Sequence, residues 1–210
     1  LVNAKAIEKI AQYAFINKLL FIHYSTDYVF DGYKDSAYLE TDITNPINVY
    51  GKSKLKGENA IIESKCKYII FRTSWVYSDN GSNFPKKILD LASKNDNLKI
   101  VSDQIGSPTS TDLISDITEK CIEKNYINSL YHLSPNGETT RFEFAKYLIN
   151  GADKRGKKLK CTIANIKPIL SKNMKSIAKR PKNSLLNCNK IKSKEGIKIP
   201  DWQIHADLFL

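Results

Sequence analysis

Tyr50 and Lys54 stand four positions apart, and Thr26 lies upstream of them at the end of a predicted strand. A phenol beside an ammonium can give a proton to a carbonyl oxygen while a hydride attacks the carbonyl carbon. The chain contains 11 tyrosines and many lysines, so one Tyr-x-x-x-Lys spacing is expected by chance. The meaning of the pair therefore depends on the residues around it.

The spacing of the pair allows a direct electrostatic effect on the phenol. A free tyrosine has a pKa of about 10, which is too high for easy proton exchange near neutral pH. An ammonium about 4 Å from the phenolate would favour ionisation by roughly 4 kcal/mol at an effective dielectric constant of about 20, or about three pKa units. Side chains at i and i+4 project from the same helical face. Thr26 could hydrogen-bond the carbonyl oxygen and orient it.

Alternating apolar runs and amphipathic segments predict the elements that hold these residues. Strands are predicted at 19–24, 68–71, 98–101 and 130–133, with helices at 2–18, around 50–62, and at 83–94 and 110–124. The run at 19–24 is typical of a strand buried on both faces of a parallel sheet. This order predicts an α/β fold with a doubly wound parallel sheet, in which ligands bind beyond the carboxyl ends of the strands. Thr26 falls at such an end.

The regular alternation of predicted strands and helices stops after Pro135. A helix is predicted at 139–150, then an irregular basic stretch, then a closing helix at 202–210. We therefore predict a first domain over 1–134 and, over 135–210, mainly a smaller lobe with contributions from about 76–97.

Charge and cysteine usage limit the function classes. The net charge is +11, and residues 154–198 hold 15 Lys and Arg against one acid, Glu195. A phosphate-binding or nucleic-acid-binding face is one interpretation, with an RNA-binding lobe ranked last. No aromatic interleaving accompanies the charge, and the Lys-, Asn- and Ile-rich composition explains it more simply. No apolar run approaches the ~18 residues that cross a bilayer. The four cysteines lack metal spacing and predict reduced thiols, a cytoplasmic location and no zinc site.

Several longer motifs carry a resemblance to a known family. They are, in chain order, Ser25-Thr26-Asp27-Tyr28-Val29-Phe30-Asp31-Gly32, Thr44-Asn45-Pro46-Ile47-Asn48-Val49-Tyr50-Gly51-Lys52-Ser53-Lys54, Arg72-Thr73-Ser74-Trp75-Val76-Tyr77, Asp103-Gln104-Ile105-Gly106-Ser107-Pro108-Thr109, Tyr131-His132-Leu133-Ser134 and Arg180-Pro181-Lys182-Asn183-Ser184. Together they closely resemble the dTDP-4-dehydrorhamnose reductases, which are extended short-chain dehydrogenases. The resemblance covers essentially the whole chain.

The resemblance implies a Rossmann-like dinucleotide-binding domain with a substrate-binding C-terminal lobe, and reduction of the 4-keto group of dTDP-6-deoxy-L-lyxo-4-hexulose to dTDP-L-rhamnose. It implies NADPH or NADH as cofactor, with Mg²⁺ as an optional addition, a nucleotide-sugar substrate, no nucleic acid or membrane partner, and a homodimer as an open alternative. The implied catalytic residues are Thr26, Tyr50 and Lys54. The implied cofactor-binding residues are Ser25, Tyr50, Lys54 and Thr73, and the implied substrate-binding residues are Thr26, Tyr28, Trp75 and Gln104.

One feature of the family is not found in these residues. The family begins with a strand and a Gly-x-x-Gly-x-x-Gly turn that cradles the cofactor pyrophosphate, and none of the nine glycines takes that spacing after a strand. By the family's layout we expect an N-terminally truncated Rossmann-like domain, with 1–210 alone poorly stable or associated with a partner. A non-catalytic regulatory or binding relative, and another nucleotide-sugar epimerase or dehydratase, stay open as alternatives.

Overall fold

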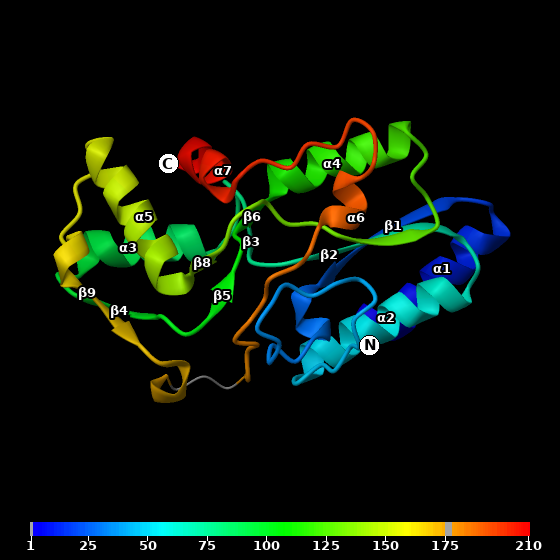
Figure 1. The fold of residues 1–210 in the computed structure, drawn as a ribbon, viewed down its shortest axis with the longest axis horizontal. Coiled ribbons are helices and arrows are strands. Elements are labelled where there is room, and N and C mark those ends of the chain that lie inside the picture. The colour runs from blue at the N-terminus through cyan, green and yellow to red at the C-terminus, as the bar shows by residue number, and fades with distance from the viewer. Residues whose placement is uncertain (1, 175–177) are drawn as a thin grey trace.

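A computed structural model describes residues 2–174 and 178–210, and a three-stranded parallel sheet forms its centre (Figure 1). The strands are β1 (Leu20–Thr26), β2 (Lys67–Thr73) and β7 (Ser129–His132), in the order β1-β2-β7. Helices α1 (Ile7–Ile16) and α2 (Val49–Glu63) lie on one face, and α4 (Thr111–Glu123) and α6 (Asn189–Lys192) on the other. The predicted α/β architecture with a parallel sheet is confirmed.

The alternation of side chains along β2 builds the cores on the two faces of the sheet. Ile69 and Phe71 are fully buried in a core that includes Leu113 and Ile117 of α4. Ile70, between them, points to the opposite face, into a core formed with α1 and with Ile61 of α2. Because both faces of β2 are covered by helices, nearly every residue of this strand is buried, as expected for a central parallel strand.

A second lobe lies beside the sheet (Figure 1). Its α3 (Phe84–Lys94) and α5 (Arg141–Lys154) pack with the parallel pair β4 (Leu98–Val101) and β9 (Ile166–Ile169) around a separate core. Two short strand pairs connect the lobe to the sheet region: β3 (Val76–Tyr77) with β6 (Thr109–Ser110), and β5 (Ile105–Gly106) with β8 (Thr139–Thr140). Helix α7 (Trp202–Phe209) ends the chain. Three single-turn helices, Asp27–Val29, Ile163–Asn165 and Ser171–Asn173, complete the fold.

Residues on each side of the predicted boundary at residue 134 pack in the core of the other part. Ile88, Ala92, Leu98 and Ile100 lie in the core of the second lobe, together with Ala145 and Ile149 from beyond residue 134. In the opposite direction, Leu186, Cys188 and Ile191 return to the core of the central sheet. The functional division at residue 134 stays a prediction.

Three expectations about individual elements need correction. The run at 19–24 is not buried on both faces: β1 lies at an edge of the described sheet, and Tyr24 is 41% exposed. The predicted helix at 2–18 is divided into a π-helical segment, Val2–Ala6, and α1, and its Ile10 and Phe15 are exposed. The basic stretch contains β9, which was not predicted. Among the described residues, no helix is both long enough and apolar enough to span a membrane.

Candidate active site

Two local capping motifs bring Thr26 and Tyr50 together. Thr26 ends β1, and its hydroxyl accepts a hydrogen bond from the backbone N–H of Tyr28 at 3.2 Å. Asn48 caps α2 by accepting from the N–H of Gly51 at 2.8 Å, which places Tyr50 in the first helical turn. A Cβ at Gly51 would overlap the carbonyl oxygen of Tyr28, so glycine permits this close approach. The two segments that carry Thr26 and Tyr50 are therefore in direct contact.

Tyr50 is a half-exposed phenol in a partly apolar setting. It is 49% exposed, and its ring meets that of Tyr28 edge to face at 5.8 Å between centroids. Partial burial and then the negative charge of Asp27 raise the pKa of Tyr50 above its ordinary value, and a hydrogen bond with Thr26 acts in the opposite direction. The phenol is therefore fully protonated near neutral pH, as a proton donor must be.

Lys54 is buried below Tyr50 on α2. Its Nζ donates to the carbonyl oxygen of Tyr24 at 2.5 Å and lies 3.2 Å from Nε2 of His23. Burial lowers the pKa of Lys54, and burial together with the Lys54 charge lowers the pKa of His23 to about 4. His23 is therefore neutral. Lys54 was expected to lower the pKa of Tyr50, but that pKa is raised. The ammonium is directed to the Tyr24 carbonyl of β1 and not to the phenol.

A buried ion pair fixes α2 to the sheet directly beside these residues. Nη2 of Arg72 lies 2.7 Å from Oε2 of Glu58, and both side chains are almost fully buried. The Ser25 hydroxyl also donates to Glu58. Ser25, predicted to bind cofactor, thus has its hydroxyl committed inside the protein. Thr73 was also predicted to bind cofactor. It pairs in register with Thr26, and its buried hydroxyl has no hydrogen-bond partner among the described residues.

Trp75 follows β2 in an unusual backbone conformation. Its φ of +49° lies in the left-handed region, which a bulky aromatic residue rarely adopts. The guanidinium carbon of Arg141 lies 3.7 Å from the centre of its ring, and Gly106 leaves room for the indole because a Cβ there would come within 2.6 Å of it. Trp75 is therefore held against the second lobe, with Arg141, which was not predicted, stacked on it.

The other predicted substrate residues lie differently. The Tyr28 hydroxyl accepts a hydrogen bond from Arg180 at 3.3 Å, so this phenol faces the returning C-terminal segment. The Gln104 amide donates to the Ser171 hydroxyl at 3.3 Å, and its backbone oxygen accepts from the N–H of Arg141. No hydrogen bond in residues 2–174 and 178–210 joins Gln104 to Thr26 or Tyr50.

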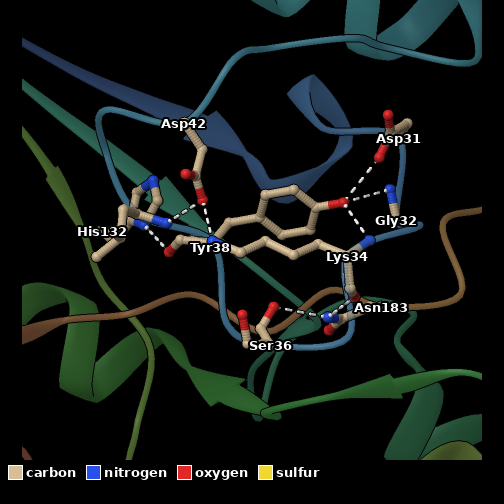
Figure 2. A network of polar contacts seen from close by, with 9 residues as sticks. Asp31, Gly32, Lys34, Ser36, Tyr38, Asp42, His132 and Asn183 are labelled. Carbon is tan, nitrogen blue, oxygen red and sulfur yellow. Dashed lines mark hydrogen bonds and ion pairs between the residues drawn. The ribbon is translucent and has the colours of Figure 1, made fainter.

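A polar network around Tyr38 holds the loop that connects Thr26 to Tyr50 (Figure 2). The Tyr38 hydroxyl donates to Asp31 at 2.8 Å and accepts from the N–H groups of Gly32 and Lys34. Its ring stacks on Phe30, with centroids 4.2 Å apart. Asn183 donates to the carbonyls of Lys34 and Ser36 and so ties the returning segment to the same loop. Sequence reasoning missed this network, although the quoted motifs contain Asp31 and Asn183.

The described part of the chain holds no group of three or more His, Cys, Asp or Glu side chains arranged to bind a metal ion. The four cysteines are free and buried.

With this geometry in place, comparison with known proteins gives a consistent result. A family model described as the RmlD substrate binding domain matches residues 1–210. The chain is 42% identical to the dTDP-4-dehydrorhamnose reductase of Escherichia coli (strain K12) over 208 residues, which is 97% of this chain and 69% of that protein. It is 41% identical to the enzyme of the same name from Sinorhizobium fredii, over 96% of this chain and 69% of the relative.

Solved structures agree. The crystal structure of the dTDP-4-dehydrorhamnose reductase from Bacillus anthracis in complex with NADP matches with a TM-score of 0.91 and 32% identity, over 99% of this chain and 70% of that one. A dTDP-glucose 4,6-dehydratase from the same organism matches with a TM-score of 0.82 at 13% identity, which is a likeness of fold alone.

Proposed function

The chain belongs to the dTDP-4-dehydrorhamnose reductase family, and from that premise we propose which of its residues carry the reaction. It is an oxidoreductase of dTDP-rhamnose biosynthesis, with NADPH as the reductant. The reaction adds a hydride to a ketone carbon and a proton to its oxygen, so the protein must supply the proton and hold the carbonyl.

Tyr50 is the proton donor in this proposal. Its side chain is half-exposed, and its hydroxyl is protonated near neutral pH and within reach of the Thr26 hydroxyl. An alkoxide that forms beside two hydroxyl donors is stabilised as its charge develops, which lowers the barrier. The meeting of Thr26 and Tyr50 at the carboxyl end of β1 is the observation that carries the proposal.

The residues around Tyr50 suit the reductant. NADPH supplies the hydride when bound. The Lys54 ammonium and the buried Thr73 hydroxyl, which lacks a hydrogen-bond partner in the described part, are donors of the kind that sugar and amide oxygens accept. We assign Lys54, Thr73 and Tyr50 to the nicotinamide-ribose end. Ser25 contributes through Glu58, which orders α2.

The nucleotide sugar is placed between the sheet and the second lobe. Tyr28 and Trp75 offer aromatic surface there, and Arg141 and Arg180 place positive charge next to them. A dTDP-sugar carries a negative diphosphate, so these cations would favour its binding. We assign Gln104 an indirect role: its backbone oxygen accepts a hydrogen bond from the N–H of Arg141 and so helps to hold Arg141 in place.

The test uses the protein expressed from its complete open reading frame, with dTDP-4-dehydrorhamnose and NADPH. We expect NADPH oxidation with formation of dTDP-L-rhamnose, identified by NMR. Thr26→Val should lower kcat by about 10²-fold or more, because a positioned hydrogen-bond donor to a developing oxyanion contributes that much. Thr44→Val, outside the site, serves as the control. An active Thr26→Val variant would contradict the role of Thr26, and an inactive wild type would favour the non-catalytic alternative.

Three finer expectations belong to the proposal. A cytoplasmic location and a homodimer stay predictions, the second open to light scattering. Mg²⁺ is tested by the rate after EDTA treatment, and the roles proposed above use only the chain's own side chains.

A further inference from the structure

Asp27 is a buried carboxyl group at the centre of the site that the roles above do not use. It is 4% exposed and follows Thr26 directly. Its Oδ1 accepts a hydrogen bond from the Thr26 hydroxyl at 3.1 Å. Its Oδ2 is buried and has no hydrogen-bond partner among the described residues. A buried ionised carboxylate with an unsatisfied oxygen is costly, which favours the neutral, protonated form of the carboxyl group.

The Thr26 hydroxyl has one hydrogen, and the Asp27 carboxylate and a substrate carbonyl would compete to accept it. In the structure that hydrogen is donated to Asp27. The same hydroxyl oxygen already accepts from the N–H of Tyr28. A substrate carbonyl can receive a hydrogen bond from Thr26 only if Asp27 releases the hydrogen.

We propose that Asp27 is a positioning residue for Thr26. When its carboxyl group carries the proton on Oδ1, the oxygen beside Thr26, it donates to the Thr26 oxygen and frees the Thr26 hydrogen for the substrate carbonyl. When the carboxyl group is ionised it keeps that hydrogen for itself. The inference rests on the proposed function, because it assigns Thr26 to the carbonyl.

The surroundings of Asp27 support two accessible protonation states. Burial raises the pKa of Asp27 to about 6, and the hydroxyls of Ser184 and Thr26 and the charge of Arg141 oppose the increase. The titratable groups that face it are Tyr28 of its own turn, Tyr50 of α2 and Arg141 of α5. Arg141 stacks on Trp75 and makes no ion pair with Asp27 in the described part.

The charge of Asp27 also acts on the proton donor. Ionised Asp27 raises the pKa of Tyr50, so it opposes the negative charge that Tyr50 must carry after it gives up its proton. A neutral Asp27 removes this opposition. Protonation of Asp27 therefore helps twice: it releases the Thr26 hydrogen, and it makes proton loss from Tyr50 easier. The protonated form of Asp27 is the active one.

The pH dependence follows with a definite direction. As pH rises through about 6, Asp27 in the free enzyme ionises and kcat/KM for the keto sugar should fall by up to about tenfold per pH unit. A bound diphosphate brings negative charge and excludes water, and both effects raise the pKa of Asp27 further. The corresponding fall in kcat should therefore lie at a higher pH than the fall in kcat/KM.

The experiment compares Asp27→Asn with the wild type from pH 5 to 8.5, in the complete protein with NADPH and dTDP-4-dehydrorhamnose. Asparagine keeps the size, cannot ionise and has an N–H₂ group that can donate to Thr26. We expect the decline above pH 6 in the wild type and a flat profile in Asp27→Asn. Asp35→Asn, an exposed carboxylate in the following loop, is the matched control and should keep the wild-type profile.

The outcomes separate the two levels of the proposal. An Asp27→Asn variant with the same decline and midpoint as the wild type would overturn the role of Asp27, and so would an active wild type with no decline. Full activity in Tyr50→Phe would overturn the proposed function itself. If Asp27→Asn does not fold, ¹³C NMR titration of the wild-type Asp27 carboxyl decides: a midpoint near 6 supports the inference, and one near 4 refutes it.

Discussion

Replacing Glu58 with glutamine should destabilise the protein far more than this modest chemical change suggests. Glu58 is 1% exposed, accepts three contacts from Arg72 between 2.7 and 3.2 Å, and also accepts from Ser25. Nη1 of Arg72 is buried and has no hydrogen-bond partner in the described part of the chain. A neutral amide in place of the Glu58 carboxylate would therefore leave a buried guanidinium charge uncompensated.

The expected size follows from this burial. Breaking a buried ion pair by removing one charge costs about 3–5 kcal/mol. Because glutamine keeps one hydrogen-bond acceptor, we expect the lower end, about 3 kcal/mol. With a urea m-value of about 2 kcal/mol/M, the unfolding midpoint should fall by roughly 1.5 M. The activity should fall as well, since the pair holds α2, with Tyr50 and Lys54, against the sheet.

The assay is urea unfolding of the complete protein, followed by tryptophan fluorescence. Glu143→Gln is the matched control: it makes the same change on a helix, but its ion pair with Lys146 lies at the surface, with Glu143 54% exposed. Such a pair contributes about 0.5 kcal/mol or less. Equal midpoints for Glu58→Gln and Glu143→Gln would refute the reasoning.

Three further predictions concern single residues of the same region. Gly51→Ala should cost about 1–3 kcal/mol and reduce kcat, because the new Cβ overlaps the Tyr28 carbonyl and displaces Tyr50; unchanged melting and turnover would contradict it. Tyr38→Phe should cost about 1–3 kcal/mol, because two N–H groups and Asp31 lose their partner, whereas the exposed Tyr33→Phe should have no effect in the same melting assay. Burial lowers the pKa of His132 to about 3, so the unfolded state binds more protons between that value and 6.5. The urea midpoint should therefore be highest above pH 6.5 and fall towards pH 3, and a midpoint that rises on acidification would exclude this contribution.

The sequence predicted the parts of the fold that local patterns determine. The apolar run at 68–71 is β2, and the strand-end rule correctly placed Thr26 at the carboxyl edge of the sheet. Strand β9 was not predicted, because Lys167 and Pro168 separate its two isoleucines and its partner strand β4 lies far away in the sequence. Tertiary pairing, which no local pattern records, decides such a strand.

The candidate site shows the same limit. Helical spacing correctly put Tyr50 and Lys54 on one helix, but it could not tell that the ammonium would reach the Tyr24 carbonyl instead of the phenol. The pKa of Asp27 depends on its burial and on the opposing effects of Arg141 and Ser184, which come from distant parts of the chain. Arg141 itself lies at the start of α5 and carries no sequence signal that marks it as part of the site.

The central claim is that Tyr50 gives the proton to the keto oxygen. The most direct measurement is the single-turnover rate of NADPH oxidation by Tyr50→Phe in the complete protein, with dTDP-4-dehydrorhamnose in excess and NADPH binding measured separately. Phenylalanine keeps the ring against Tyr28 and removes only the hydroxyl. We predict a loss of at least about 10²-fold in rate with NADPH affinity nearly unchanged. A rate near that of the wild type would contradict the claim.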